Sequence, residues 1–428
     1  MEDLLVFKLP ENSDKQTTKI SNIIQTTSIN QPLFSMGFHS FLHRTKNAMD
    51  ITNNLDSDNN FYYIVNPFES IITDYDEDIN TYFSKFIQKE PGILSNSFYI
   101  CWEILHIFKL TNDTNMNIAT LGDGIGSVKQ AFIKYRQIMN NNTKDTIYNT
   151  SIKSEKNKYD TANKDFMNLY KKNIVNHRVY TSITSNKNDD KDTGDLRTSK
   201  SINLFVKELK GNNVDLVFGN AKPYISDMNF TEQAYYKLLL GEILTSFKIN
   251  KKSSNLVLRI NEMFTHPTIK IIYFLSYYYE ECFIHKPSFS RDIDSDKYII
   301  CKKFKFNNSE IKKEIDSLET LFNSIDDTMF INDIFVDLKI PEQFLNLIKY
   351  VNINFANKQQ ILINKIVKYI KNNNYFGEEY HSYKNTQIKS TKMWLEHFTK
   401  DNNSIIEIVN KTINFYNNEL SIFIKNLK

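Results

Sequence analysis

The chain has 428 residues, of which 41% are hydrophobic and 13% aromatic; this is enough apolar surface for a sizeable core and excludes a disordered chain. Lysine and arginine (53) nearly balance aspartate and glutamate (50), so there is no global basic field and any contact with RNA must be a local patch. The three cysteines, Cys101, Cys282 and Cys301, are odd in number and widely spaced, which excludes a disulfide framework and favours a reducing, intracellular setting.

The first 95 residues show no strong hydrophobic period, and we expect helices and loops there. The chain starts with an acidic segment and lacks the basic and apolar segments of a signal peptide. The longest apolar run, 269–279, is too short to span a bilayer. These features predict a soluble, cytoplasmic protein that does not insert into a membrane.

The segment from residue 97 to 139 carries the first clear pattern. Apolar side chains recur every three or four positions in 97–109, which is typical of an amphipathic helix. A short apolar strand at 117–121 follows, then the turn GDGIGS at 122–127, then a helix-period segment. The composition at 140–164 and 185–193 changes to Asn, Lys, Thr and Asp, which predicts surface loops.

Strands and helices then alternate up to residue 306, which predicts a Rossmann-like, doubly wound α/β sheet. We expect strands at 179–183, 213–218 and 255–260, helices at 231–247 and 267–280, and an antiparallel pair of strands, 281–285 and 298–302, at one edge. Helix periods at 310–322, 342–372, 386–398 and 404–427 predict a C-terminal helical region. The chain thus divides into an N-terminal extension (1–95), an α/β domain (96–306) and a helical region (307–428).

Three of the ten glycines, Gly122, Gly124 and Gly126, fall within five residues between the predicted strand and helix. Such a turn lets the backbone approach a nucleotide closely and aims helix N–H groups at the ligand. A tight turn without any ligand is the plainer interpretation. The clustering in so glycine-poor a chain favours a nucleotide or nucleoside site.

A second motif, in residues 255–302, connects the chain to a known family. The segment resembles the FtsJ-like RNA ribose 2′-O-methyltransferases, whose pattern here is a strand ending in Lys, an aromatic-rich helix and KPxxSRPxNSExYxVCK. Eight residues stand at the matching spacing: Lys286, Pro287, Ser290, Arg291, Ser295, Tyr298, Cys301 and Lys302. The closest likeness is to the cap-directed and large-DNA-virus branch, which implies a place in the cytoplasm, in a viral factory or in the virion.

The resemblance extends upstream to about Ser97. DLVFGNAKP (215–223) stands where the family has DLVxADGG, and LGDGIGS resembles the end of the family's DLxxxPGGF loop. The resemblance therefore implies the fold of S-adenosylmethionine-dependent methyltransferases. Its implied cofactor, S-adenosylmethionine, would be held by Gly122, Gly124, Gly126 and Asp195, and RNA would be bound by Lys286, Ser290 and Arg291. Ile125, where the family has Gly, is expected to crowd the methionine end of the cofactor.

The family's Lys-Asp-Lys-Glu tetrad, which orients and deprotonates the target ribose hydroxyl, is substituted at all four positions. The matching residues are Ile100, Asn220, Arg259 and Asp296, and we expect the last three to converge beside the glycine turn. Ile100 can neither donate nor accept, and a guanidinium stays protonated and cannot act as a base. Losing a positioned acid or base costs typically about 10²–10⁴ in rate. The resemblance therefore predicts a catalytically impaired or inactive member of the family.

Three functions are compatible with these residues. The first is an active methyltransferase acting on the ribose of an mRNA cap, and the second is a pseudoenzyme that binds RNA or docks onto a capping or transcription complex. The third is a purely structural protein that has kept the fold alone. No metal is expected, because the eight histidines show no HxH or HExxH spacing. The substituted tetrad favours the pseudoenzyme.

Overall fold

The computed structural model describes residues 4–20, 22–29, 36–55, 60–85, 92–140, 144–152, 168, 174–180, 194–225, 230–372, 375–400 and 404–427. The strands are β1 (Leu5–Lys8), β2 (Ile24–Thr26), β3 (Asn117–Leu121), β4 (Thr146–Ile152), β5 (Ile174–Tyr180), β6 (Val214–Gly219), β7 (Asn250–Ile260), β8 (Tyr279–Lys286), β9 (Lys297–Phe304) and β10 (Phe330–Asp333). The first helical elements are η1 (Lys15–Thr18), α1 (Met36–Asn47), η2 (Ala48–Asn54), η3 (Asn60–Val65), α2 (Ile79–Ser84), α3 (Ser97–Phe108) and α4 (Ser127–Met139). The later helices are α6 (Ser199–Glu208), α7 (Thr231–Ile249), α8 (His266–Tyr278), α9 (Lys312–Asn323), α10 (Glu342–Asn372), α11 (Glu378–Phe398) and α12 (Ser404–Asn426).

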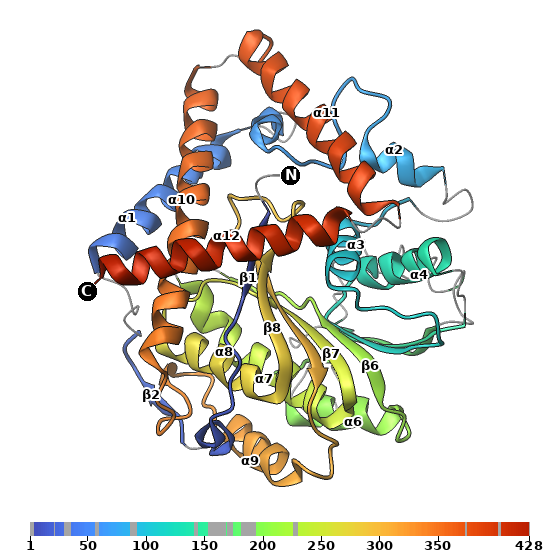
Figure 1. The fold of residues 1–428 in the computed structure, drawn as a ribbon, viewed down its shortest axis with the longest axis vertical. Helices are drawn as coiled ribbons and strands as arrows, with labels where there is room; N and C mark the ends of the chain where they lie inside the picture. Colours follow the sequence, from blue (N-terminus) through green and yellow to red (C-terminus); the bar gives the residue numbers. More distant parts are fainter. Residues whose placement is uncertain are drawn as a thin grey trace.

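The predicted doubly wound sheet is confirmed. Its strand order in the described residues is β1-β8-β9-β7-β6-β3-β4-β5 (Figure 1). The strands β7, β6, β3, β4 and β5 run parallel, while β9 is antiparallel to both β7 and β8. The chain moves outward from β3 to β4 and β5 and then returns to β6 on the other side of β3. This reversal creates a switch point between β3 and β6, where folds of this type bind ligands.

Apolar side chains on both faces of the sheet explain the helix layers. Ala119 and Leu121 of β3 pack with α6, α7, α8 and α9, whereas Ile118 packs on the other face with α3 and α4. Strands buried on both faces need such cover on each side, as parallel sheets do. The Arg136 guanidinium near the end of α4 bonds Asp145 at 2.8 Å just before β4, so this buried ion pair also ties α4 to the sheet.

The N-terminal extension contributes a strand that the sequence prediction missed. The expectation of helices and loops in residues 1–95 is wrong for 5–8, which form β1 and pair antiparallel with β8, and for 24–26, which form β2 and pair with β10. Leu5 and Phe7 are buried on one face of the sheet and Leu4 and Val6 on the other. This run is too short to show a period, and only the free edge of β8 makes it a strand.

Strand β4 lies within the segment predicted to be a surface loop. The prediction for 140–164 is wrong at 146–152, because these residues pair in parallel with β3 and are mostly buried. The polar side chains there are satisfied inside the sheet, as the hydrogen bond of 2.7 Å from the Thr120 hydroxyl to Asn149 Oδ1 illustrates. Strand β5 begins at Ile174, earlier than predicted, and 181–193 lie outside the described residues.

The sequence predicts the antiparallel strands β8 and β9 at one edge of the sheet, and this prediction is wrong. Strand β9 lies between β7 and β8, and β1 covers the outer side of β8. The predicted C-terminal helices are present as α9 to α12, and α12 crosses over β1, where Tyr416 and Phe7 have ring centroids 4.4 Å apart (Figure 1). Strands β2 and β10 pair antiparallel in a small second sheet.

Candidate active site

The glycine turn follows β3 at the carboxyl edge of the sheet. Gly122 has φ +68°, and its N–H donates to the Thr150 carbonyl at 2.8 Å. A Cβ on Gly122 would lie 2.3 Å from Cβ of Ala221, so no larger residue fits at this position. The close approach brings the turn against the segment that follows β6, and it places the glycines at the switch point of the sheet.

The buried side chain of Asp123 caps the N-terminus of α4. Its buried carboxylate accepts hydrogen bonds from the backbone N–H groups of Val128 at 2.8 Å and Lys129 at 3.0 Å. Burial raises the pKa of Asp123, and the Lys129 ammonium opposes that shift. The space above Gly124 is open, since an added Cβ there would meet no atom within 4 Å. A ligand would therefore meet the backbone of the turn rather than the capped N–H groups of the helix.

The Lys129 amine is buried and has no hydrogen-bond partner. Burial lowers its pKa to about 8, and the nearby Asp123 carboxylate limits the fall. An orphaned amine beside the turn is an unsatisfied donor, which is costly in a protein interior.

Asp195, the predicted cofactor residue after β5, is buried and engaged within its own loop. Its carboxylate accepts hydrogen bonds of 3.0 Å from the Arg197 backbone N–H, Nε and Nη2. Arg197 Nε also donates to Asp195 Oδ2 at 3.3 Å, so Arg197 engages both oxygens of the carboxylate. The pKa of Arg197 is raised by this hydrogen bonding.

Asn220 lies at the end of β6, and its side chain is held from two sides. Its Oδ1 accepts a hydrogen bond of 2.9 Å from the Tyr298 hydroxyl, and its Nδ2 donates to the Ser97 hydroxyl at 3.2 Å. Ile100 lies one turn along α3 from Ser97 and is buried in the core on that face. Tyr298 is buried and was not singled out from the sequence for this contact, although it is part of the matching motif.

Arg259 and Asp296 form a partly buried ion pair, each side chain being 13% exposed. Burial opposes ionisation of Asp296, but Arg259, Lys222 and Lys286 together hold the pKa of this carboxyl below its usual range. Burial likewise opposes the charge on Arg259, yet Asp296 raises the pKa of the guanidinium further. Arg259 also pairs with Tyr298 across the β7 and β9 ladder. The structure thus brings Asn220, Arg259 and Asp296 together around Tyr298.

A carboxyl group that sequence reasoning missed lies on the other side of β6. Glu242 of α7 is fully buried, and its Oε1 accepts a hydrogen bond of 3.4 Å from the Ala221 N–H. Burial raises the pKa of Glu242 to about 8, although the Ala221 N–H and Arg259 favour its charged form. Glu242 lies in a segment whose pattern predicts an amphipathic helix, and nothing in that pattern indicates that its carboxyl group is buried.

We expect Glu242→Gln to change how stability depends on pH. The pKa of about 8 in the folded protein lies above the ordinary value of 4.5, so the folded state binds the proton more tightly than the unfolded state does. The stability that this proton contributes is complete below pH 4.5 and is lost as pH rises through 8. The glutamine variant, which keeps the acceptor oxygen, is expected to flatten this fall by a few kcal/mol. Urea unfolding of both proteins between pH 5 and 9 measures the free energy of unfolding. The same pH dependence in both proteins would contradict the raised pKa of Glu242.

The three predicted RNA-binding residues have partners within the protein. Lys286 Nζ donates to the Ser290 hydroxyl at 3.2 Å and to the carbonyls of Asp294 and Asp296 at 2.9 Å each. Arg291 pairs with Glu69 of the N-terminal extension at 2.7 Å, and its guanidinium lies 3.8 Å from the centre of the Tyr63 ring. Lys286 and Ser290 therefore shape the loop before β9, while Arg291 joins that loop to the extension.

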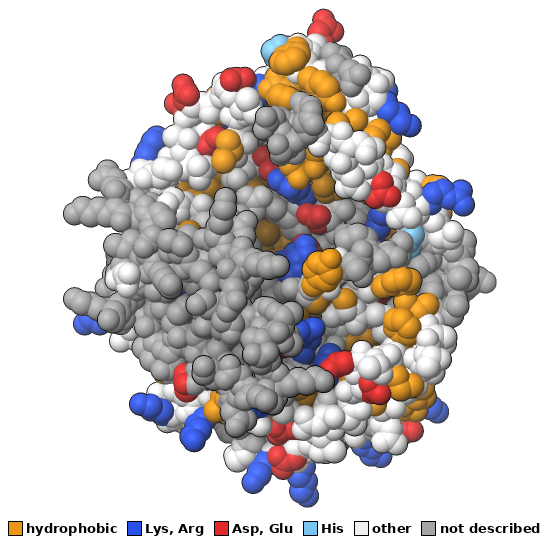
Figure 2. All heavy atoms as spheres, turned by 180° about the vertical axis from the view of Figure 1, so that it is seen from behind, with side chains coloured by type: hydrophobic (Ala, Val, Ile, Leu, Met, Phe, Trp, Pro, Cys, Tyr) orange, Lys and Arg blue, Asp and Glu red, His pale blue; other side chains and the backbone are white. Residues whose placement is uncertain are grey.

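Lys and Arg side chains are scattered over the surface in Figure 2. On the face turned away from the viewer of Figure 1, Lys and Arg side chains lie near the centre, beside hydrophobic side chains (Figure 2). Among the described residues, no group of three or more His, Cys, Asp or Glu is arranged to hold a metal ion. None of the helices in the described part of the chain is long and apolar enough to cross a membrane.

Comparisons with known proteins agree with this architecture. Residues 103–304 match the family model of FtsJ-like methyltransferases. An uncharacterized protein of Acanthamoeba polyphaga mimivirus is 28% identical over 51% of this chain and 59% of its own length. Two proteins of Caenorhabditis briggsae match 44% of this chain. They are the inactive cap-specific mRNA (nucleoside-2′-O-)-methyltransferase 1B, at 25% identity over 24% of its length, and the corresponding methyltransferase 1A, at 26% over 22%.

The chain therefore covers less than two thirds of each of these relatives. Among solved structures, a putative ribosomal RNA methyltransferase from Plasmodium falciparum aligns with 49% of this chain and 97% of its own, at 15% identity and a TM-score of 0.33.

Proposed function

We propose that the protein is a homologue of cap ribose 2′-O-methyltransferases that binds RNA but transfers methyl groups poorly or not at all. The premise is the match of residues 103–304 to the family model of FtsJ-like methyltransferases. The protein would act as an RNA-binding or docking subunit beside a capping or transcription complex, in the cytoplasm or a viral factory. An active enzyme acting on viral mRNA caps is the alternative.

The pairing of Arg259 with Asp296 carries this proposal. The guanidinium stays protonated and its charge is already balanced by the carboxylate, so Arg259 offers no base to a ribose hydroxyl. Asn220 is neutral and held by Tyr298 and Ser97. Ile100 has no polar atom. None of these three positions supplies a group that accepts the proton of the 2′-hydroxyl, so the 10²–10⁴ in rate that such a group typically gives is absent.

The residues of the glycine turn fit S-adenosylmethionine, the cofactor of this family. Gly122 and the open space at Gly124 let a nucleoside approach the backbone at the switch point. The orphaned Lys129 amine lies next to the turn. When bound, the cofactor supplies the activated methyl group. The protein would contribute the turn, Asp195 and the backbone at the carboxyl ends of β3 and β6.

Asp296 favours the alternative of an active enzyme. Its pKa is held low by three cations, so it stays ionised and can orient a hydroxyl group. Of the two Caenorhabditis briggsae relatives, one is named as inactive and the other is not. The two possibilities differ in turnover and not in binding, so a methyl-transfer assay separates them.

The test uses the full chain with S-adenosylhomocysteine, with RNA and with radiolabelled S-adenosylmethionine. We expect S-adenosylhomocysteine to stabilise the protein, by about 2.7 kcal/mol at a hundred times its Kd. We also expect salt-dependent RNA binding and no methyl transfer above background to capped or uncapped RNA. Robust transfer by the wild-type protein would overturn the proposal, and so would a failure to bind RNA.

A further inference from the structure

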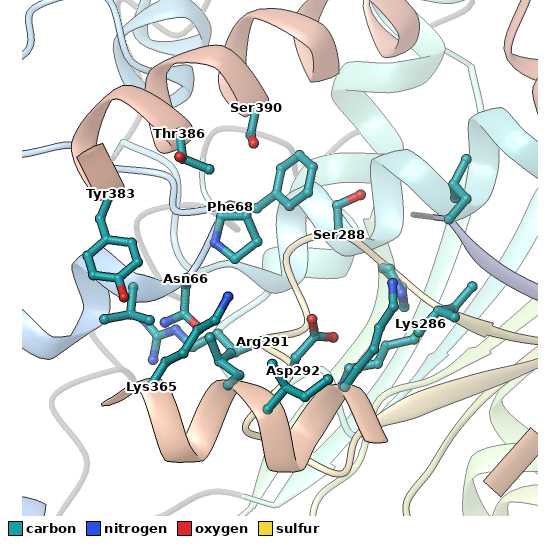
Figure 3. Close-up of a pocket in the computed structure, with 18 of the residues that line it drawn as sticks. Asn66, Phe68, Lys286, Ser288, Arg291, Asp292, Lys365, Tyr383, Thr386 and Ser390 are labelled. Carbon is teal, nitrogen blue, oxygen red and sulfur yellow. The ribbon is translucent and has the colours of Figure 1, made fainter. Parts of the chain in front are cut away.

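A cavity of about 470 Å³ lies between the loop before β9 and the helices α10 and α11. Its walls come from the segment 65–68, the loop 286–292 and these two helices (Figure 3). Most of the lining residues lie outside 103–304, the part that matches the family model. The cavity is therefore formed mainly by segments outside the matched part, and its volume is in the range of pockets that bind ligands, about 300–1,000 Å³.

Apolar side chains form much of the cavity wall. Val65 and Phe68 come from the N-terminal extension, and Leu362 and Met393 come from α10 and α11. The apolar surface continues to the outside of the protein, because Ile361 also lines the cavity and is 57% exposed. Apolar surface that runs from a cavity to the exterior is typical of interaction sites. The cavity therefore suits a ligand with an apolar anchor.

Positive charge borders this apolar wall. The helix α10 carries five lysines, at positions 349, 358, 365, 368 and 371, against one acid, Glu342. Lys365 lines the cavity, is exposed, and forms no salt bridge with any residue that the structure describes. Figure 3 shows its side chain extending into the cavity. A carboxylate on the ligand would therefore be attracted by Lys365 and by the net charge of α10.

Polar groups in the wall suit a peptide backbone. Asn66 lines the cavity and is 1% exposed; its Nδ2 donates to Glu69 at 3.0 Å, but its Oδ1 accepts no hydrogen bond from the described residues. A buried acceptor without a partner is costly, and a ligand with an N–H group removes that cost. The hydroxyl groups of Thr386 and Ser390 line the opposite wall (Figure 3). A peptide presents N–H and carbonyl groups along its length and can use both walls.

We propose that this cavity docks a segment of a partner protein in which an apolar residue stands next to an acidic one. The apolar side chain fills the cavity beside Phe68, the carboxylate pairs with Lys365, and a backbone N–H donates to Asn66 Oδ1. The inference rests on the docking role in the proposed function, and it names the surface and the chemical kind of the partner. A phosphate chain is the less suitable ligand, because more of the wall is apolar than polar.

The test begins with a selection of binding peptides. A phage-displayed library of random dodecapeptides is panned on the immobilised full-length protein, and the enriched peptides are synthesised with a fluorescein label. Anisotropy measures their binding to the wild-type protein over a range of salt concentrations. We expect enriched sequences in which an aspartate or glutamate stands next to an aromatic or aliphatic residue. We also expect affinities that fall as salt rises, because salt screens the pairing with an exposed lysine.

Two variants with the same substitution separate the cavity from the rest of the surface. Ile361→Glu removes the apolar side chain at the opening and places a carboxylate four residues before Lys365, a spacing that stabilises a helix and neutralises the lysine. Ile138→Glu is the matched control, because Ile138 is 38% exposed and belongs to α4, which lies away from α10 in Figure 1. Thermal melting checks that both variants fold.

We expect Ile361→Glu to weaken peptide binding about tenfold or more, as the loss of a central interface contact does. Ile138→Glu is expected to change it less than about twofold. An unlabelled single-stranded RNA decamer is not expected to displace the peptide. Equal binding by the two variants, enriched sequences without acidic residues, or displacement by the RNA would each overturn the proposal. Panning that enriches nothing above an uncoated surface would overturn it as well.

Failure of this proposal is distinguishable from failure of the proposed function. The peptide assays report on the cavity, whereas RNA binding and methyl transfer by the same proteins report on the proposed function. Ile361→Glu and Ile138→Glu are both expected to bind RNA as the wild-type protein does. Methyl transfer by the wild-type protein would contradict the proposed function without affecting the peptide site.

Discussion

The combination of Ile100→Lys, Asn220→Asp and Arg259→Lys is expected to give detectable methyl transfer, whereas Arg259→Lys alone is expected to give none. The triple variant restores two amines and the carboxylate that orients them, and a lysine can lose its proton where arginine cannot. Residues that act as a unit are strongly non-additive, so a single reversion recovers little. The measurement is radiolabelled methyl transfer to a short capped RNA, with all proteins at equal concentration.

The structure identifies Ile100→Lys as the costly step of this reversion. Ile100 is 9% exposed and belongs to the core between α3 and the sheet. A lysine at position 100 must either extend its amine toward the Arg259 and Asp296 pair or bury a charge in the core. The double variant without Ile100→Lys is the matched control, because it keeps the core unchanged. Transfer by the double variant equal to that of the triple variant would show that the amine at position 100 is not needed.

Replacing Glu103 by leucine is expected to destabilise the fold by about 3 kcal/mol or more, because it leaves several buried donors without an acceptor and each costs about 1–3 kcal/mol. The Glu103 carboxylate is completely buried and accepts hydrogen bonds from the Ser288 N–H at 3.0 Å and Trp394 Nε1 at 3.0 Å. His285 Nε2 lies 3.2 Å from the same carboxylate, and its Nδ1 lies 3.0 Å from the carbonyl of Leu5. One side chain of α3 therefore connects β8, β1 and α11.

Urea unfolding measures the effect, and limited proteolysis reports whether α11 and β1 loosen before the sheet unfolds. Glu396→Leu is the matched control, because Glu396 is an exposed acid of α11 and surface substitutions usually change stability by less than about 0.5 kcal/mol. A Glu103→Leu protein as stable as this control would show that the buried network contributes nothing to docking the two chain ends.

The sequence by itself determined the elements whose signals are local. The strand at 117–121, the glycine turn and the helix after it were predictable, because a change of period around three glycines lies within about twenty residues. The motif at 286–302 predicted a resemblance to the FtsJ-like methyltransferases, since its matching residues are neighbours in the chain, and residues 103–304 match the model of that family. The resemblance over 255–302 predicted Arg259 and Asp296 at substituted tetrad positions; that correspondence stays a prediction, and the two side chains form an ion pair.

Only the tertiary structure decided the features that depend on distant partners. Strand β1 forms because β8, nearly 280 positions later, offers it a free edge, and β4 forms because β3 gives its polar residues partners. Glu103 gives no sign in the sequence of its contacts with Ser288 and Trp394. The cavity exists only where α10 and α11 close over the loop before β9. Hydrophobic periods and motifs report what a residue does with its chain neighbours, whereas edge pairing, buried carboxylates and cavities are set by segments that meet only after folding.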